Sequence, residues 1–449
     1  MKRSFERARR AARTGPRHGQ PAGRYRYVRI RWRLLFAAVD SVGRRLWRIG
    51  RAIGAAWPGD SNEHGHDPRS ILLVQLDHLG DAVLSASVLP ALRRRFPRAR
   101  IEVLAAPWNR EVFAACPEVD RLHVSRLNRF TRGFRLGWIA ATFWWGWKLR
   151  RERFDLAIDV RGEFPLALIL WLTGARRRLG WDCGGGGFLL TDRARYEPGR
   201  PEVESRLALL AEVGVEPDPD LLRREPWFDA GHDARRCVDD LLDGLGERSQ
   251  PLYLLHIGAG TRAKRWQADR WRELLGRLIV EHNAQVVLIG AGEERAWAAA
   301  ITGGLAWPGV HDWTGRLSLV ETAALIERAD VFVGADSGPA HLAAAVGTPA
   351  VVLFSGTNRV EQWRPWGRRV VVLKHEVACS PCHRQTCPWM EHPCMSRLTA
   401  LSVSRAIHAL RAAILGTPPA GLGDLDRAAD PPGVEVVTPS SPPSARKSG

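Results

Sequence analysis

Short apolar runs of strand length alternate with segments of helical periodicity along most of this 449-residue chain. The runs 71–76 and 252–257 are almost wholly apolar and are bounded by charged or turn residues. Strands that are apolar on both faces are typical of parallel sheets, because helices cover both faces of such sheets. Strands are predicted at 71–76, 101–106, 156–160, 252–257, 285–289, 331–333 and 350–354, and helices at 82–96, 269–281, 293–301, 319–328 and 339–346. This alternation predicts an α/β fold.

The strand and helix pattern occurs in two series, which a variable stretch near 226–250 separates. A chain of this length is also too long for one typical domain. We therefore expect two Rossmann-like, doubly wound domains, at 70–235 and 250–415, that face each other across a cleft. Residues 1–69 are expected to form a basic amphipathic arm and linker. Residues 417–449, rich in Pro, Ser and Gly, are expected to be disordered.

Positive charge is concentrated at the beginning of the chain. The net charge is +18, and residues 1–60 hold sixteen Lys and Arg against three acidic side chains, which accounts for thirteen of those charges. A nucleic acid would therefore meet only the arm, and no specific nucleic-acid partner is expected.

The arm contains apolar residues three and four positions apart, which is the spacing of one helical face. They are Leu35, Val39, Val42, Leu46, Ile49, Ile53 and Ala56. Arginines between them favour a helix that lies on an anionic membrane surface, and a helix packed on the domain or a disordered arm remain the alternatives. The run with Trp138, Trp144, Trp145 and Trp147 has two interpretations, as core or as a membrane-interface segment, with core slightly favoured.

No apolar run reaches the ~18 residues that a spanning helix needs. The first apolar stretch begins late, is interrupted by Arg and lacks a small-residue cleavage site. We therefore expect a cytoplasmic protein that lies on a membrane without crossing it.

A strand-to-helix turn at 334–341 combines Asp336, Ser337, Gly338, Pro339 and His341. Free backbone N–H groups and the positive end of the helix dipole at such a turn suit a diphosphate. Asp336 is expected to bind a sugar or ribose hydroxyl, and His341 to donate to a phosphate oxygen. The alternative is a well-capped helix with a solvated His.

Two further glycine-containing loops, at 256–261 and 290–294, follow strands of the same predicted sheet. Lysine at 264 supplies a point charge for phosphate without a metal. Three loops on one sheet edge favour a nucleotide site more than any single loop does. The donor-binding candidates in these two loops are Gly260, Thr261, Lys264, Glu293 and Glu294.

The first predicted domain contributes two candidate polar residues. Asp81, near the start of a helix, either favours the helix dipole or takes a proton from an acceptor hydroxyl. Arg161, after a strand, either contacts an anionic acceptor or forms an ion pair within the fold.

Four of the seven cysteines lie close together, at Cys379, Cys382, Cys387 and Cys394. Four thiols at this spacing suit a structural zinc ion. Reduced thiols packed in a loop, or reversible disulfides, are the alternatives.

The segment 71–84, the loop that ends in Lys264-Arg265-Trp266 and the turn Asp336 to His341 resemble glycosyltransferase family nine, the ADP-heptose:lipopolysaccharide heptosyltransferases. The resemblance covers roughly residues 70–410. It implies a GT-B fold, an inverting mechanism without an obligatory metal or cofactor, and transfer of heptose from ADP-heptose to a lipid-linked lipopolysaccharide core at the inner membrane.

The resemblance also implies roles for individual residues. Asp81 matches the catalytic base, Lys264 the phosphate-binding lysine, and Glu294 or Glu293 the nucleotide-side carboxylate. Asp336, Ser337, Gly338 and His341 match the donor-binding turn. The family's phosphate-loop hydroxyls align near Ala259 and Gly260, which have none, so that Thr261 or backbone N–H groups must replace them.

Two other kinds of function remain open from the residues themselves. One is a transferase or epimerase that uses another nucleotide sugar, although an epimerase needs neither an acceptor surface nor a membrane arm. The other is a non-catalytic protein that binds nucleotide sugars or nucleic acid.

Overall fold

The computed structural model describes residues 30–52, 66–125, 136–197, 199–216, 218–219, 222, 226–245, 249–416 and 434–437. The described residues cluster into two compact units. The first unit is drawn from Met1–Val74 and Phe134–Tyr196, and the second from Gln75–Gly133 and Glu197–Gly449.

The first of two sheets has six strands in the order β3-β2-β1-β4-β5-β6. They are β3 (Arg121–Val124), β2 (Arg100–Ala105), β1 (Ser70–Gln75), β4 (Leu156–Asp159), β5 (Arg177–Trp181) and β6 (Asp192–Ala194). β1 pairs in parallel with β4, with Ile71 opposite Leu156, and every residue of both strands is buried. This burial explains why both strands read as continuous apolar runs.

The second sheet has seven strands in the order β13-β12-β11-β10-β7-β8-β9. They are β13 (Val434–Val437), β12 (Val370–His375), β11 (Ala350–Phe354), β10 (Val331–Ala335), β7 (Leu252–His256), β8 (Gln285–Ile289) and β9 (Val310–Asp312). The pairings from β12 to β9 are parallel, and β13 pairs antiparallel with β12. The disorder expected for 417–449 is therefore wrong at Val434–Val437, where backbone pairing with an edge strand orders the chain; the rest of that tail lies outside the described residues.

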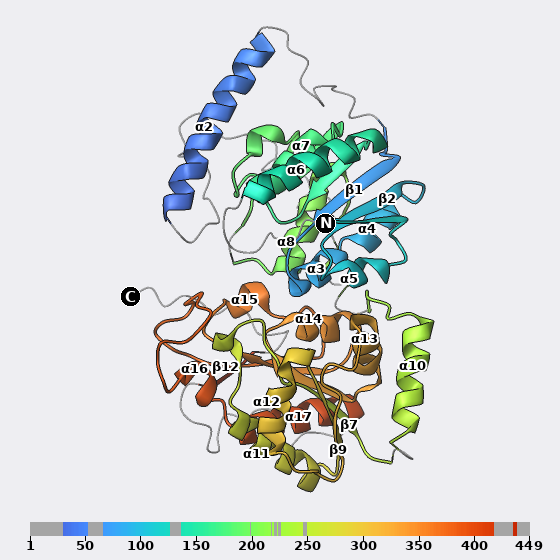
Figure 1. The fold of residues 1–449 in the computed structure, drawn as a ribbon, viewed down its shortest axis with the longest axis vertical. Helices are drawn as coiled ribbons and strands as arrows, with labels where there is room; N and C mark the ends of the chain where they lie inside the picture. The colour runs from blue at the N-terminus through green and yellow to red at the C-terminus, as the bar shows by residue number, and fades with distance from the viewer. Residues whose placement is uncertain are drawn as a thin grey trace. The chain divides into compact units, whose positions relative to one another are not determined.

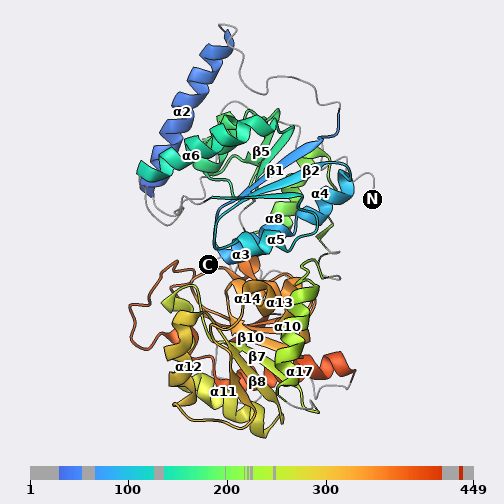
Figure 2. The same ribbon diagram turned by 45° about the vertical axis from the view of Figure 1, so that its right-hand side comes forward.

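Helices flank both sheets (Figure 1). Those described are α2 (Ile30–Ala52), α3 (Leu79–Ala86), α4 (Leu89–Arg95), α5 (Arg110–Ala114), α6 (Leu136–Leu149), α7 (Phe164–Leu172), α8 (Glu202–Leu209), α10 (His232–Asp243), α11 (Ala268–Val280), α12 (Arg295–Thr302), α13 (Leu319–Arg328), α14 (Gly338–Ala345), α15 (Val360–Trp363), α16 (Pro393–Ser396) and α17 (Ala400–Leu415). In Figure 2, α11 and α12 lie on one side of β7 and β8, and α10 and α13 lie on the other.

The core of the second sheet explains why the spacing of apolar residues predicted these helices. Alternate residues of β7 and β8 pack against the apolar stripes of α11, α12 and α17 in one buried cluster. Trp266 and Trp271 meet edge to face at 4.9 Å, and the Trp266 indole donates to the Leu398 carbonyl at 2.9 Å. The satisfied indole lets this large ring be buried without a hydrogen-bond penalty.

Most predicted elements agree with the structure to within a few residues, and the strands at Gln285–Ile289 and Ala350–Phe354 agree exactly. The helix predicted at 82–96 is wrong in two respects. It begins earlier, at Leu79, and it is split into α3 and α4 by a turn at Ser87 and Val88. As a result, Asp81 lies inside the first turn of α3.

The arm forms the helix α2, so its described part is not disordered. Ile53, Ala56 and the linker up to residue 65 lie outside the described residues. No helix in the described part of the chain is long and apolar enough to span a membrane.

Candidate active site

An ion pair joins two loops at the carboxyl edge of the second sheet. Lys264 Nζ donates to Asp336 Oδ2 at 2.6 Å and to the Asp336 carbonyl at 3.0 Å. Both side chains are largely buried. β7 and β10 are neighbours in parallel register, so the loops that follow them must meet at this edge. The structure thus brings together two of the predicted donor-binding residues.

Asn358 completes this cluster and was not predicted. Its amide Nδ2 donates to Asp336 Oδ2 at 2.9 Å. Asn358 follows β11, the other neighbour of β10. Asn358 could have been identified from the sequence by its position after a strand of the same sheet, because the other loops were identified in this way.

The turn after β10 has the expected form, with one difference. Ser337 is the N-cap of α14 and Pro339 lies in the first turn, but no side chain caps the helix. The Ser337 hydroxyl donates instead to the Ala335 carbonyl at 3.1 Å. The amino end of α14 therefore keeps its positive dipole end without a side-chain oxygen, which suits an anion.

His341 is buried, so the alternative of a solvated histidine is wrong. Burial lowers its pKa to about 4, although the charge of Asp336 opposes this shift. The ring is therefore neutral at pH 7, and Nδ1 is a buried atom without a hydrogen-bond partner. A buried, unpartnered polar atom one turn into a helix amino end is suited to a polar ligand group.

The first turn of α3 packs against the first turn of α14 within the second unit. A Cβ placed on Gly80 would lie 3.3 Å from the His341 ring and 3.5 Å from Gly338 Cα. The charge of Asp81 also raises the pKa of His341, though less than burial lowers it. Glycine at 80 permits this approach, which places Asp81 beside the turn at 334–341.

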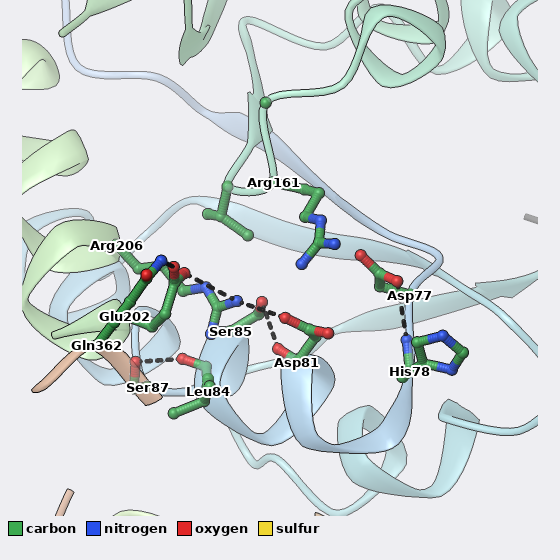
Figure 3. Close-up of polar contacts among 12 residues, drawn as sticks. Asp77, His78, Asp81, Leu84, Ser85, Ser87, Arg161, Glu202, Arg206 and Gln362 are labelled. Carbon is green, nitrogen blue, oxygen red and sulfur yellow. Dashed lines mark hydrogen bonds and ion pairs between the residues drawn. The ribbon is translucent and has the colours of Figure 1, made fainter. Parts of the chain in front are cut away.

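Asp81 has a buried partner that the sequence analysis missed. Arg206 Nη2, on α8, contacts Asp81 Oδ1 at 3.0 Å and Glu202 Oε2 at 3.6 Å (Figure 3). Gln362 Nε2 donates to Glu202 Oε1 at 2.7 Å. Arg206 is almost fully buried, and its Nε and Nη1 have no hydrogen-bond partner. An arginine on the apolar side of the segment 202–209 was the signal that could have identified it.

Comparisons with known proteins identify the family of the chain. The profile of glycosyltransferase family 9 (heptosyltransferase) matches residues 145–392, more than half of the chain. The chain is 30% identical to lipopolysaccharide heptosyltransferase 2 of Salmonella typhimurium over 302 residues, 64% of this chain and 83% of that protein. The chain belongs to glycosyltransferase family 9. It is also 26% identical to lipopolysaccharide heptosyltransferase 3 of Escherichia coli, over 65% of this chain and 85% of that protein.

The solved structure of the E. coli ADP-heptose lipopolysaccharide heptosyltransferase II has the same fold as this family 9 chain, with a TM-score of 0.61 at 23% identity. The similarity covers 77% of this chain and 99% of that one. The predicted GT-B fold and the prediction of a glycosyltransferase are therefore confirmed.

The two glutamates predicted in the loop at 290–294 of this family 9 chain differ in their surroundings. Glu294 is buried, and its carboxylate accepts from the backbone N–H groups of Ala291, at 2.9 Å, and Ala259. Burial raises its pKa, opposed by these hydrogen bonds and by Arg265. A Cβ on Gly258 would overlap this carboxylate and displace it, so glycine at 258 leaves room for Glu294. Glu294 thus links the loop at 256–261 to the loop at 290–294, and Glu293 is the exposed carboxylate.

Gly260 and Thr261, in the loop at 256–261, differ in what they offer a ligand. Gly260 has open space around its Cα. The Thr261 hydroxyl oxygen is buried and has no hydrogen-bond partner. Thr261 therefore has the free polar group that the resemblance required at this loop.

Arg161, in the first unit of this family 9 chain, lies in the loop after β4. Its Nε donates to Glu163 Oε1 at 3.2 Å, so the ion pair considered for it is present. Its backbone N–H donates to Asp159, whose pKa burial raises to about 7. The loop is therefore fixed by a buried carboxyl group, and the predicted contact of Arg161 with an acceptor remains a prediction.

The four clustered cysteines do not form the tetrahedral set that a zinc ion needs. Among the described residues, no three His, Cys, Asp or Glu side chains are arranged to hold a metal ion. Cys379 is exposed whereas Cys394 is buried, and all four are free thiols. The alternative of reduced thiols packed in a loop fits the structure better.

The cysteine-rich segment instead contacts the loops that hold Lys264 and Asn358. The Ala263 N–H donates to the Gln385 carbonyl at 2.8 Å, and His392 Nε2 lies 3.0 Å from the Ala263 carbonyl. Two further backbone bonds, Cys382 to Gly356 at 2.8 Å and His383 to Thr357 at 3.1 Å, hold the loop before Asn358. The segment thus connects the residue next to Lys264 with the residue next to Asn358.

Proposed function

We propose that this chain transfers heptose from ADP-heptose to a sugar of the lipopolysaccharide core, with inversion at the anomeric carbon. The curated relatives at 25–30% identity carry the names of lipopolysaccharide heptosyltransferases, which supports this donor and this acceptor. The observation that carries the proposal is the Lys264–Asp336–Asn358 cluster beside the uncapped amino end of α14.

The donor diphosphate is proposed to bind at the amino end of α14. Lys264 supplies a positive charge, and its bonds to Asp336 fix its position before the donor arrives. His341 is neutral and donates one N–H, so it stabilises charge without having to lose a proton. Thr261 offers a hydroxyl, Glu293 is the exposed carboxylate for the ribose, and Gly260 and Gly338 allow close approach of backbone to the diphosphate.

Asp81 is proposed to act as the base. It accepts the proton of the acceptor hydroxyl while the oxygen attacks the anomeric carbon from the face opposite the diphosphate. The C–O bond to the diphosphate breaks as the new glycosidic bond forms, and ADP leaves with the electron pair. Arg206 holds one carboxylate oxygen, Oδ1, and so positions the other toward the acceptor.

The remaining parts of the proposal concern partners and location. Residues 70–235 are proposed to bind the acceptor, with Arg161 near its anionic groups, and residues 250–415 to bind the donor. The acceptor is lipid-linked, so the enzyme is proposed to act from the cytoplasm as a peripheral protein of the inner membrane. No metal or cofactor is required in this scheme, because Lys264 and the helix dipole stabilise the leaving charge.

Calorimetry with four ligands tests the donor assignment: ADP-heptose, ADP, a UDP-sugar and a GDP-sugar. The proposal expects a preference for ADP-heptose that falls at least about tenfold in Lys264→Ala, the loss of one charged hydrogen bond. Arg262→Ala is the matched control, because it removes one exposed positive charge from the same loop. A preference for a UDP- or GDP-sugar would contradict the donor, and no binding of any ligand would contradict the transferase mechanism.

A further inference from the structure

Helix α2 is attached to the first unit by one face. The ring of Phe36 lies 5.7 Å from that of Phe164, and the buried carboxylate of Asp40 accepts from the Gly186 N–H at 2.7 Å. Gly43 lies directly against Phe188, so that a Cβ there would overlap the ring. Positions 36, 40 and 43 are four and three apart, which defines a docking face on the helix.

A different face of α2 carries exposed apolar side chains. Leu35, Val42, Leu46 and Ile49 are each about half exposed or more, with Leu46 at 60%. Their spacing of seven, four and three residues places them on one stripe of the helix. The helix therefore packs on the unit, as one of the alternatives expected, but it does so through the neighbouring face and leaves this stripe exposed.

Helix α6, in the same unit, shows the same division. Trp145 and Leu149 are buried, and Gly146 lies against Leu172 of α7. Phe143, Trp144 and Trp147 are exposed, with Trp147 at 59%. Of the predicted tryptophan run, Trp145 is therefore core and Trp144 and Trp147 are surface, while the side chain of Trp138 lies outside the described residues.

Basic side chains lie close to the exposed apolar residues of both helices. Lys148 Nζ lies 4.8 Å from the Trp144 ring, and Arg151 lies 4.9 Å from the Trp147 ring. On α2, Arg45 and Arg48 are exposed. Asp40, which is buried in the docking face, is the only acidic residue in the sequence of α2, and the sequence of α6 has none.

We infer that α2 and α6 form a single lipid-binding surface of the first unit, defined by Leu35, Val42, Leu46 and Ile49 with Phe143, Trp144 and Trp147, and that its partner is an anionic bilayer. Apolar side chains enter the interface, tryptophan rings lie at the headgroup level, and Lys and Arg meet anionic headgroups. The inference rests on the membrane part of the proposed function and deepens it, because it adds α6 and a fixed attachment for α2.

A second copy of the chain fits this surface less well. Two such surfaces would bring like positive charges together, since acidic residues are missing from both exposed faces. An anionic bilayer instead complements both the charge and the apolar area. Fixed attachment of α2 also means that lipid binding does not have to order a free chain first.

Sedimentation of the full-length protein with vesicles tests the inference. Vesicles of phosphatidylcholine with phosphatidylglycerol are compared with vesicles of phosphatidylcholine alone. Leu46→Ser with Ile49→Ser removes apolar area from α2, and Phe143→Ser with Trp147→Ser removes it from α6. The matched control is Val280→Ser with Leu305→Ser, two apolar residues of the second unit that are even more exposed.

We expect the wild type to bind the anionic vesicles, less strongly at high salt, and each test pair to weaken binding about tenfold or more. The control pair should bind as the wild type does. Wild-type binding that is equal on neutral vesicles would overturn the anionic partner, and an unchanged α6 pair would overturn the part played by α6. Light scattering that shows a wild-type dimer dissociated by the α2 pair, with unchanged vesicle binding, would assign the surface to a second copy.

Calorimetric binding of ADP-heptose, measured without vesicles, separates this inference from the donor assignment. Test variants that keep donor affinity and lose vesicle binding support the lipid surface. Loss of vesicle binding together with donor binding and the folded circular dichroism signal would show that the variants unfold. Arg45→Gln with Arg48→Gln, which changes only exposed charge, then decides the question through vesicle binding alone.

Discussion

Replacement of Arg206 by methionine should separate the stability of the buried charge cluster from its part in catalysis. Methionine keeps the length of the side chain and removes its charge. Arg206 and Glu202 are both almost fully buried, so the variant leaves the Glu202 carboxylate in the interior without the cation that lies 3.6 Å from it. Breaking a buried pair in this way costs about 3–5 kcal/mol in the free energy of unfolding.

A second substitution removes the charge of Glu202 as well. Arg206→Met with Glu202→Gln should recover part of the lost stability, because the buried carboxylate on α8 is then neutral, whereas Asp81 has still lost its arginine partner. Arg328→Met is the matched control. It breaks a two-bond pair with Asp239 whose members are about one third and one half exposed, and should cost about 1 kcal/mol or less.

The catalytic effect should persist in the double variant. Asp81 loses its 3.0 Å partner, and a misplaced base lowers kcat by about 100-fold. Donor affinity should stay within about twofold, since Arg206 is bonded to carboxylates and not to the Lys264 cluster. Urea unfolding, transfer kinetics and donor calorimetry measure the three quantities. Wild-type kcat in the stable double variant, or an equal loss of donor affinity, would refute the positioning role.

Three other predictions follow from the site. Asp81→Asn should lower kcat about 100-fold or more with donor affinity unchanged; equal loss of both in kinetics and calorimetry would indicate a binding or folding role. Burial lowers the pKa of His341 to about 4 from 6.5, so between these pH values the unfolded chain binds a proton that the folded chain does not bind. The contribution of the neutral His341 ring to stability is therefore present above pH 6.5 and is lost as the pH falls toward 4. Urea unfolding should therefore show a drop from pH 6.5 to 5 that is about 2 kcal/mol smaller in His341→Gln, and an identical drop would contradict a neutral buried ring. His392→Ala should weaken ADP binding several-fold, because it removes the hydrogen bond to the Ala263 carbonyl next to Lys264, and His392→Gln, which keeps a donor, should restore the affinity. Equal ADP affinity in the wild type and both variants would mean that His392 contributes only packing.

The sequence predicted the α/β class well because buried parallel strands leave an unambiguous pattern. Gln285–Ile289 and Ala350–Phe354 were predicted exactly, since each is apolar on both faces and is bounded by polar or turn residues. The split between α3 and α4 was missed, because Ser87 and Val88 interrupt the helix without a Gly or Pro to mark the turn. The strand at Val434–Val437 was missed because its pairing with β12 comes from far along the chain.

The candidate site was predictable where it follows the sheet edge and not where it depends on packing. Lys264 and Asp336 each come directly after a strand, so parallel topology brings their loops together. For the clustered cysteines, spacing along the chain was not enough, because it does not determine how the thiols are oriented, and no three His, Cys, Asp or Glu side chains among the described residues are arranged to hold a metal ion. Glu294 illustrates the same limit, since its neighbour Glu293 has an identical side chain and the fold buries only one of them.

The strand and helix alternation, the loops at the sheet edge and the family resemblance follow from the amino-acid sequence, because they depend on local periodicity and on motifs. The partners that those residues meet depend on the tertiary structure. It joined Arg206 to Asp81 across 125 positions and Asn358 to Asp336. It also attached α2 by the face that carries Asp40 and left its apolar stripe exposed. A helix has several faces, and the neighbouring surface, not periodicity, selects the one that is buried.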